Sequence, residues 1–185
     1  NYQSIELSEK KIAKNPIEQF ENWFNDALNA NLYEPNAMTL ATTSIDRKPS
    51  ARIVLLKGVD EKGFVFYTNY LSAKGKEIAK NPVVALVFFW AELARQVRIE
   101  GTVEKLSKEA SEQYFHSRPR GSQLGAIVSP QSQILASRDD LEKTWKELEQ
   151  KYENKTLPKP AHWGGYLVKP QIIEFWQGRE SRLHD

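Results

Sequence analysis

The stretch Val83–Trp90, VVALVFFW, and the stretch at residues 95–106, RQVRIEGTVEKL, decide the fold of this chain. The first is an almost continuous apolar run of strand length, which predicts a strand buried on both faces. The second follows closely as a long strand, in which Gly101 marks a predicted bulge. Two strands joined by such a short connection predict a hairpin, and therefore an antiparallel sheet.

Strand patterns continue on both sides of this hairpin. Polar turns at residues 46–49 and 60–63 separate the upstream strands, and a last hairpin is predicted to turn near Lys169-Pro170. The further predicted strands are Ala37–Thr43 and residues 51–57, 64–68, 163–168 and 171–177. Strands in hairpin-like succession imply an antiparallel barrel or sandwich.

Helical patterns flank the strands. Asn15 and Pro16 begin one helix, and apolar residues at helical spacing follow them. Further helices are predicted at Ala73–Lys80, at residues 107–115, at residues 122–128 with Ser122 as the cap, and after a capping box of Ser137 and Asp140. We therefore expect a mainly β protein with flanking helices (α+β). A flexible arm at residues 1–14 precedes a single domain over residues 15–185.

Composition excludes several classes of function. The 185 residues carry a net charge of +2, three histidines and no cysteine. Disulfides and thiol chemistry are therefore excluded, no metal site is expected, and the mild charge argues against a nucleic-acid partner. No apolar run is long enough to span a membrane, and the polar N-terminal residues lack the apolar core of a secretion signal. We expect a cytoplasmic protein without a membrane partner.

One polar stretch, residues 114–123 (YFHSRPRGSQ), lies between two predicted helices. It combines Tyr114 and Arg118 with the hydroxyl of Ser122 at a predicted helix start. Backbone N–H groups, the positive end of a helix dipole and a neighbouring arginine make an anion site, and a phosphate suits it best. A solvated basic turn is the alternative, because charged turns are common and the spacing is not that of a fixed motif.

Two other groups of residues suggest ligand contacts less specifically. Tyr67 and Thr68 end a predicted strand and Ser72 and Lys74 open a helix, which suits a second phosphate site or a plain helix cap equally well. Arg52 and Lys57 bracket an apolar run. Strict alternation places them on opposite faces, and two ordinary strand-end charges are the favoured interpretation of that spacing.

The remaining candidates are single residues. Gln96 begins a strand among apolar neighbours and suits the polar edge of a ring, whereas Gln131 and Ser132, in a loop, indicate little by themselves. Trp176 is more typical of a core than of a cofactor platform. An alternating strand places Arg182 and His184 on one face, where the histidine is able to exchange a proton near neutral pH; a frayed tail is the alternative.

Taken in order, the chain from about Asn15 to its end resembles the pyridoxine (pyridoxamine) 5′-phosphate oxidase family. The strings that carry the resemblance are RIVLLK at 52–57, FYTN at 66–69, RQV at 95–97, YFHSRPRGSQ at 114–123, WGG at 163–165, EFWQG at 174–178 and RLHD at 182–185. The resemblance implies an FMN-binding split β-barrel of the antiparallel Greek-key type. It also implies a homodimer with two sites at the subunit interface, to both of which each chain contributes.

The resemblance further implies roles for individual residues. FMN is expected to contact Arg52, Ile53, Val54, Leu55, Leu56, Lys57, Tyr67, Thr68, Lys74 and Gln96, with Gln131, Ser132 and Trp176 completing the flavin site from the partner chain. The substrate phosphate is expected to contact Lys57, Tyr114, Arg118 and Ser122. Arg182 and His184 are the expected catalytic residues, which contact the pyridine ring and hold it against the flavin. His184 is also a candidate acid or base, although direct hydride transfer from the amine substrate needs little proton chemistry.

The implied reaction is the FMN-dependent oxidation of pyridoxine 5′-phosphate or pyridoxamine 5′-phosphate to pyridoxal 5′-phosphate, a step of vitamin B6 metabolism. O₂ is the implied electron acceptor and H₂O₂ the by-product, and the flavin carries the redox chemistry. The alternative is an FMN-binding split-barrel protein without this activity. The phosphate-site and ring-site residues argue against that alternative, because a carrier does not need them.

The chain departs from the family pattern at two places. Ala73-Lys74 stands where the family has Arg-Lys, so one contact to the FMN phosphate is missing and weaker FMN binding is expected. The family also continues beyond the position of Asp185 with an arginine that contacts the flavin and a final strand. A shortened C-terminal end is therefore expected.

Overall fold

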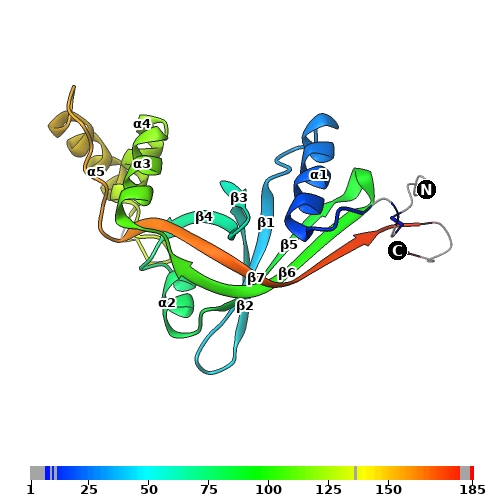
Figure 1. Cartoon of the computed structure of the whole chain (residues 1–185). Helices are drawn as coiled ribbons and strands as arrows, with labels where there is room; N and C mark the ends of the chain where they lie inside the picture. Colours follow the sequence, from blue (N-terminus) through cyan, green and yellow to red (C-terminus); the bar gives the residue numbers. More distant parts are fainter. Residues whose placement is uncertain (1–6, 9, 11, 136, 180–183) are drawn as a thin grey trace.

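The computed structural model describes residues 7, 8, 10, 12–135, 137–179 and 184–185. In this part of the chain the strands form one seven-stranded sheet, in the order β2-β1-β5-β6-β7-β4-β3, and every neighbouring pair is antiparallel. The strands are β1 Ala37–Thr43, β2 Pro49–Leu55, β3 Gly58–Asp60, β4 Gly63–Asn69, β5 Val83–Trp90, β6 Arg95–Lys105 and β7 Trp163–Gln177. The sheet curls, and the long β7 pairs with β6 on one side and with β4 on the other (Figure 1).

Helices cover the sheet at separate places, which confirms the expected mainly β protein with flanking helices. They are α1 Pro16–Asn29, α2 Ala73–Lys80, α3 Lys108–Ser117, α4 Arg120–Val128 and α5 Arg138–Lys151, with the 3₁₀ turn η1 Ala91–Leu93 between β5 and β6. Figure 1 shows α3, α4 and α5 gathered at one end of β6 and β7, and α1 nearer the other end. In the described part of the chain, none of the helices combines the length and apolarity needed to cross a membrane.

The main core lies between α1 and the concave face of the sheet. Asn15 caps α1 by accepting a hydrogen bond from the Ile17 N–H at 2.8 Å, as the sequence predicted. Phe20 lies on the apolar face of the helix and is buried. Its ring packs edge-on against the Phe64 ring, with centroids 4.9 Å apart, and its centroid lies 5.0 Å from that of Phe88. Burial of such aromatic rings is a large apolar contribution to stability, and it fixes the curvature on which the site depends.

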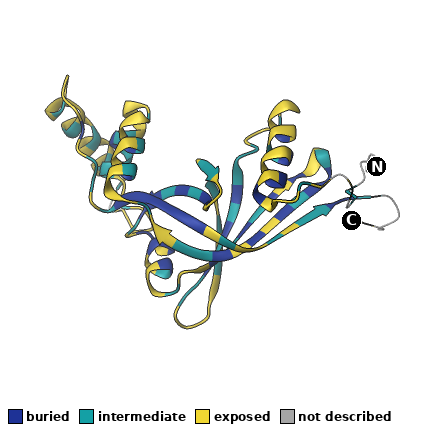
Figure 2. Ribbon diagram, in the orientation of Figure 1, coloured by how far each residue is buried: buried dark blue, intermediate teal, exposed yellow. Residues whose placement is uncertain are grey.

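Strand β5 is not buried on both faces, so that prediction was wrong. Its residues alternate: Leu86 and Phe88 are fully buried, whereas Val83 and Phe89 are 55% and 64% exposed. Figure 2 shows the same alternation along the neighbouring strands. The reason is that helix α1 covers only one face of this part of the sheet in a single chain.

The end of the second strand also differs from the prediction. Strand β2 spans Pro49–Leu55 rather than residues 51–57, because its ladder with β1 runs from Leu55, opposite Ala37, to Pro49, opposite Thr43. Lys57 follows the strand, and its N–H donates to the Val65 carbonyl at 2.8 Å. The chain then enters the short strand β3, which the sequence did not predict.

The predicted last hairpin is instead one long strand, β7, and the turn at Lys169-Pro170 does not exist. Pro170 lies opposite Gly101, where the register shifts at the bulge between Glu100 and Gly101. Proline donates no ladder hydrogen bond and is tolerated at a bulge. The predicted bulge at Gly101 is confirmed: a Cβ atom there would lie 2.1 Å from the Lys169 carbonyl oxygen.

Helix α4 begins at Arg120, so Ser122 is not its cap. Pro119 occupies the N-cap position without a side-chain hydrogen bond, and Ser122 lies in the first turn with its N–H bonded to the Pro119 carbonyl at 2.9 Å. The fixed φ of proline lets the helix start immediately after it. By contrast, Ser137 caps α5 as predicted, accepting from the Asp140 N–H at 3.0 Å.

Candidate active site

A pocket of about 690 Å³ opens between the β2 end of the sheet, the β4–α2 junction and helices α3 and α4. The end of β2 contributes Ile53, Val54, Leu55 and, just beyond it, Lys57. Strand β4 and helix α2 contribute Tyr67, Thr68 and Lys74, and the α3–α4 segment with the following loop contributes Tyr114, Arg118, Ser122 and Gln131. Most of the residues predicted for the FMN and substrate-phosphate sites therefore meet in one cavity.

An aromatic stack forms one wall of this pocket. Tyr67 and Tyr114 lie parallel with ring centroids 3.8 Å apart, and Trp163 stacks on Tyr67 at 5.4 Å. Burial raises the pKa of both tyrosine hydroxyls, with the neighbouring tyrosine adding to the shift for Tyr67. Both hydroxyls therefore stay protonated at neutral pH and are able to donate hydrogen bonds to an anion.

Arg118 packs against this wall. Its Cζ atom lies 4.7 Å from the centroid of the Trp163 ring, and its Nη1 atom is buried without a hydrogen-bond partner among the described residues. Burial lowers the pKa of the guanidinium, which nevertheless stays charged. A cation with a buried, unsatisfied donor beside a pocket suits an anionic ligand.

Lys74 supplies a second cation from helix α2. The residue is only 8% exposed, and its Nζ donates to two neutral oxygens, Gln131 Oε1 at 3.1 Å and Thr68 Oγ1 at 3.3 Å. Burial lowers its pKa, and the charge of Arg52 adds to that effect. A buried ammonium with neutral partners fits a phosphate group, which would restore charge balance.

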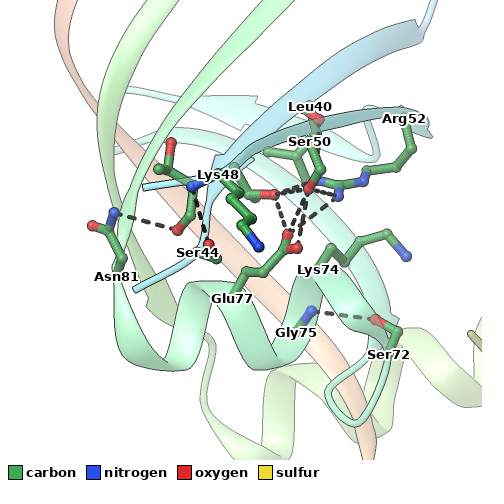
Figure 3. Close-up of polar contacts among 12 residues, drawn as sticks. Leu40, Ser44, Lys48, Ser50, Arg52, Ser72, Lys74, Gly75, Glu77 and Asn81 are labelled. Atoms are coloured by element: carbon green, nitrogen blue, oxygen red, sulfur yellow. Dashed lines mark hydrogen bonds and ion pairs between the residues drawn. The ribbon is translucent and has the colours of Figure 1, made fainter. Parts of the chain in front are cut away.

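Arg52, by contrast, is held outside the pocket lining. Figure 3 shows its guanidinium with Ser50 and the carboxylate of Glu77, which reaches up from α2. The Arg52–Glu77 ion pair spans 3.2 Å, and Thr42 and Ser50 donate to the same carboxylate. The Thr42 hydrogen bond is the largest cause that lowers the pKa of Glu77. This network ties α2 to β1 and β2 and places Arg52 beside Lys74 rather than in the cavity.

Leu56 and Ser132 lie away from the pocket, whereas Gln131 lines it from the same chain. Leu56 is 5% exposed and belongs to the main core. Ser132 is exposed in the loop after α4, in a left-handed conformation with φ of 65°. Gln131, expected to act from a partner chain, here bonds Thr68 and Lys74 of its own chain.

Gln96, Trp176 and His184 gather at the opposite end of the sheet. Gln96 and Trp176 are paired across β6 and β7, and the His184 ring lies 4.8 Å from the Trp176 ring. The His184 Nδ1 accepts from the Arg179 N–H at 3.0 Å, so in the neutral ring Nε2 carries the proton. Arg182 lies outside the described residues, and so does its predicted placement on one face with His184.

The length of β7 separates these two groups of residues. Trp163 begins the strand and Trp176 lies one residue before its end. A strand rises about 3.3 Å per residue, so the two tryptophans lie on the order of 40 Å apart along it. One ligand of ordinary size is unable to reach both ends of the same chain.

Trp163 was not among the predicted site residues. It belongs to the string WGG, whose glycines have a packing reason: a Cβ atom at Gly164 would lie 2.2 Å from the Tyr70 hydroxyl. The signal in the sequence that pointed to Trp163 was its position directly before two glycines, which leave space for aromatic rings against the sheet. Asn69, Gly125 and Ser129 also line the pocket and were missed.

Comparison with known proteins identifies the family. The profile of pyridoxamine 5′-phosphate oxidase matches residues 24–152, and that of the pyridoxine 5′-phosphate oxidase C-terminal dimerisation region matches residues 163–185. The chain belongs to the pyridoxamine 5′-phosphate oxidase family. Among its relatives are the pyridoxine/pyridoxamine 5′-phosphate oxidases of Acaryochloris marina, 60% identical over the whole chain and 84% of the relative, and of Salinibacter ruber, 57% identical over the whole chain and 86% of the relative.

Solved structures of this family's fold superpose well on the chain. PhzG from Burkholderia lata, solved with tetrahydrophenazine-1-carboxylic acid, is 27% identical with a TM-score of 0.93 over all of this chain and 91% of PhzG. An FMN-binding protein of Nostoc punctiforme related to the family is 15% identical, with a TM-score of 0.67 over 95% of this chain and 96% of its own. The predicted split-barrel fold is thereby confirmed. The whole of β7, with Trp163 and Trp176, falls in the match to the dimerisation region.

Proposed function

We propose that this oxidase converts pyridoxine 5′-phosphate or pyridoxamine 5′-phosphate to pyridoxal 5′-phosphate, with FMN as its cofactor and O₂ as the electron acceptor. The family and the names of relatives about 60% identical support the substrate class. The observation that carries the proposal is the pocket itself. Lys57, Tyr114, Arg118 and Ser122 line it together, and these are the four residues expected to hold a substrate phosphate.

Two of the cations that line the pocket, Lys74 and Arg118, suit two phosphate groups. Lys74, at the start of α2, is proposed to hold the FMN phosphate with Thr68 and the helix N-terminus. Arg118, next to the start of α4, is proposed to hold the substrate phosphate. Apolar Ile53, Val54 and Leu55 border the cavity between them and suit the flat face of a ring.

The reaction balances with O₂ alone for the alcohol: R–CH₂OH + O₂ gives R–CHO + H₂O₂. The amine additionally takes up water and releases ammonia: R–CH₂NH₂ + O₂ + H₂O gives R–CHO + NH₃ + H₂O₂. FMN, when bound, supplies the two-electron acceptor and passes the electrons to O₂. The protein's own residues bind the phosphate remote from the reacting carbon, which fixes the orientation of the substrate.

The remaining ring contacts are proposed to come from a second copy of the chain. Trp176 and His184 lie far along β7 from the pocket, and that strand falls in the match to the family's dimerisation region. In a symmetric homodimer each pocket would then receive Gln96, Trp176, Arg182 and His184 from the partner. The Nδ1 of His184 accepts from the Arg179 N–H, so in the neutral ring the hydrogen lies on Nε2.

The direct test is aerobic turnover of pyridoxine 5′-phosphate by the FMN-loaded protein, following the aldehyde and H₂O₂ together. We expect the two products to form in equal amounts. Binding of FMN without either product would refute the oxidase activity and favour a flavin-binding protein of the same fold. Failure to bind FMN would overturn the cofactor assignment.

A further inference from the structure

Trp163 holds a fixed position beside the pocket. It is 6% exposed and packs with Phe115, Leu124 and Leu157 in a second core beneath α3 and α4. As the first residue of β7 it is paired with Asn69 at the end of β4. The sheet and this core therefore determine where the indole ring lies, whether or not a ligand is present.

Within the residues that the structure describes, two arginines lie over tryptophan faces, and they differ in one respect. The Arg95 Cζ lies 4.5 Å from the Trp23 ring, and its guanidinium also donates to Asp26 at 2.7 Å and to Gln177 at 2.9 Å. Arg118 has the ring contact of the same kind with Trp163, but no described residue accepts a hydrogen bond from its guanidinium. A partly buried guanidinium without acceptors is costly, and an anion in the pocket would satisfy it.

Among the described residues no hydrogen bond holds the Arg118 guanidinium, so its contact with the Trp163 ring is the main interaction available to fix its direction. Cation–π attraction arises from the quadrupole of the ring, is strongest for tryptophan and grows when water is excluded. Tyr114, which also lines the pocket, lies parallel to Trp163 within 3° at a centroid distance of 6.3 Å. The Trp163 indole and the Tyr114 ring are thus parallel beside the pocket.

We propose that Trp163 is a positioning residue for phosphate recognition, whose indole face holds the Arg118 guanidinium at the pocket wall with its remaining N–H groups directed to the ligand. The proposal rests on the proposed function, because the phosphate is that of the substrate. Trp163 itself need not touch the substrate. Its effect is expected only on phosphorylated ligands and only while Arg118 is present.

The test uses 4-deoxypyridoxine 5′-phosphate, in which a methyl group replaces the reacting 4′ group. This ligand is neither oxidised nor able to form a Schiff base, so its dissociation constant is measurable on the FMN-loaded protein by equilibrium dialysis. We expect Trp163→Leu to raise the dissociation constant about tenfold. Trp163→Phe retains an aromatic ring with weaker cation–π attraction, so we expect it to raise the constant about threefold. Binding of unphosphorylated 4-deoxypyridoxine is expected to change less than about twofold, since it offers Arg118 no anion.

A double-mutant cycle with Arg118→Met separates positioning from a general loss of structure. If Trp163 acts through Arg118, then Trp163→Phe has no effect on the dissociation constant in the Arg118→Met background. Equal effects in both backgrounds, or equal weakening of the unphosphorylated ligand, would overturn the proposal. The cycle with phenylalanine decides the matter even if Trp163→Leu does not fold.

Trp23→Phe is the matched control, because it weakens the other arginine–tryptophan contact, which does not line the pocket of its own chain. It is expected to lower the melting temperature while leaving the dissociation constant unchanged. If the parent protein binds the phosphorylated ligand no more tightly than the unphosphorylated one, both this proposal and the substrate assignment fail. If the parent shows that preference but oxidises nothing, only the proposed activity fails, and the cycle still decides the role of Trp163.

Discussion

Individual residues decide how much positive charge the FMN side of the pocket presents. Ala73 is exposed at the first position of α2, directly beside Lys74, and Ser72 caps the helix by accepting from the Gly75 N–H at 3.3 Å. The nearby charge of Arg52 is already engaged by Glu77. Lys74 is therefore the main cation that this chain offers to a phosphate at the α2 N-terminus.

Ala73→Arg is expected to tighten FMN binding about fivefold, because it adds a charge-assisted hydrogen-bond donor at the helix N-terminus. The measurement is quenching of flavin fluorescence on addition of protein freed of FMN. Ala79→Arg, exposed near the other end of the same helix, is the control and should leave the affinity nearly unchanged. Equal tightening by both variants would indicate bulk charge rather than a local contact.

Lys74→Met is expected to stabilise the FMN-free protein while weakening FMN binding. Burial lowers the folded-state pKa of Lys74 below its unfolded value, so the unfolded chain binds more protons between the two values. The buried ammonium therefore reduces stability below that window, and stability rises with pH across it. We expect a gain of about 1 kcal/mol, or roughly 2–4 °C in Tm, at neutral pH, which shrinks in alkaline buffer.

Thermal melting with and without FMN checks this expectation. Lys76→Met, an exposed lysine on the same helix, is the control and should change neither Tm nor FMN affinity appreciably. A lower Tm for Lys74→Met than for the parent without FMN would show that the lysine is stabilising as it stands.

At the level of elements, a bulge shapes the long strand β7 where it pairs with β6. The register skips Gln171 of β7 opposite Glu100 and Gly101, and Gly101 leaves space for the Lys169 carbonyl. Beyond the bulge, residues 163–168 of β7 pair with β4, and residues 166–168 pair with β6 as well. The length of this strand, with Trp163 at the pocket and Trp176 near the far end, is the structural reason that the site residues fall into two separate groups.

Gly101→Ala is expected to destabilise the protein by at least about 2 kcal/mol, because its Cβ would lie 2.1 Å from the Lys169 oxygen. Urea unfolding measures the change. Gly58→Ala is the control: its Cβ would lie 3.8 Å from the nearest atom, and the expected change is within about 0.5 kcal/mol. Similar losses for both variants would contradict a specific role for the bulge.

At the scale of the whole molecule, one chain does not bring all the proposed site residues together. Arg118 and Lys74 lie at the pocket, whereas Trp176 and His184 lie at the other end of β7. The exposed Val83 and Phe89 on β5 also leave apolar surface outside the single chain's core. A symmetric dimer would cover such a face and complete two equivalent sites.

Hybrid dimers test this arrangement. Arg118→Met and His184→Ala homodimers are each expected to show little activity at substrate concentrations far below KM. Mixed and reassembled subunits should recover about a quarter of the parent activity, because half of the dimers are hybrids and each hybrid holds one intact site. No recovery on mixing, with dimer exchange verified by a tag, would place Arg118 and His184 in the same chain's site.

Local signals in the sequence predict much of the secondary structure, and its ordered strings indicate the family. The cap at Asn15, the helix Ala73–Lys80 and the bulge at Gly101 depend on nearby backbone chemistry and were correctly predicted. The resemblance of ordered strings also selected most of the pocket residues before any geometry was known. Local propensity failed at Lys169-Pro170, because a long-range ladder with β6 overrides a turn signal.

Only the tertiary structure decided which of those residues lie together. The curl of the sheet brings β2, β4 and the start of β7 around one pocket. Trp176, near the last residue of β7, lies at the other end of the sheet. Tertiary packing also pairs Arg52 with Glu77 and sets the Arg118 guanidinium over the Trp163 ring. These contacts join residues far apart in the sequence, so they depend on packing across the whole sheet, which no local pattern in the chain encodes.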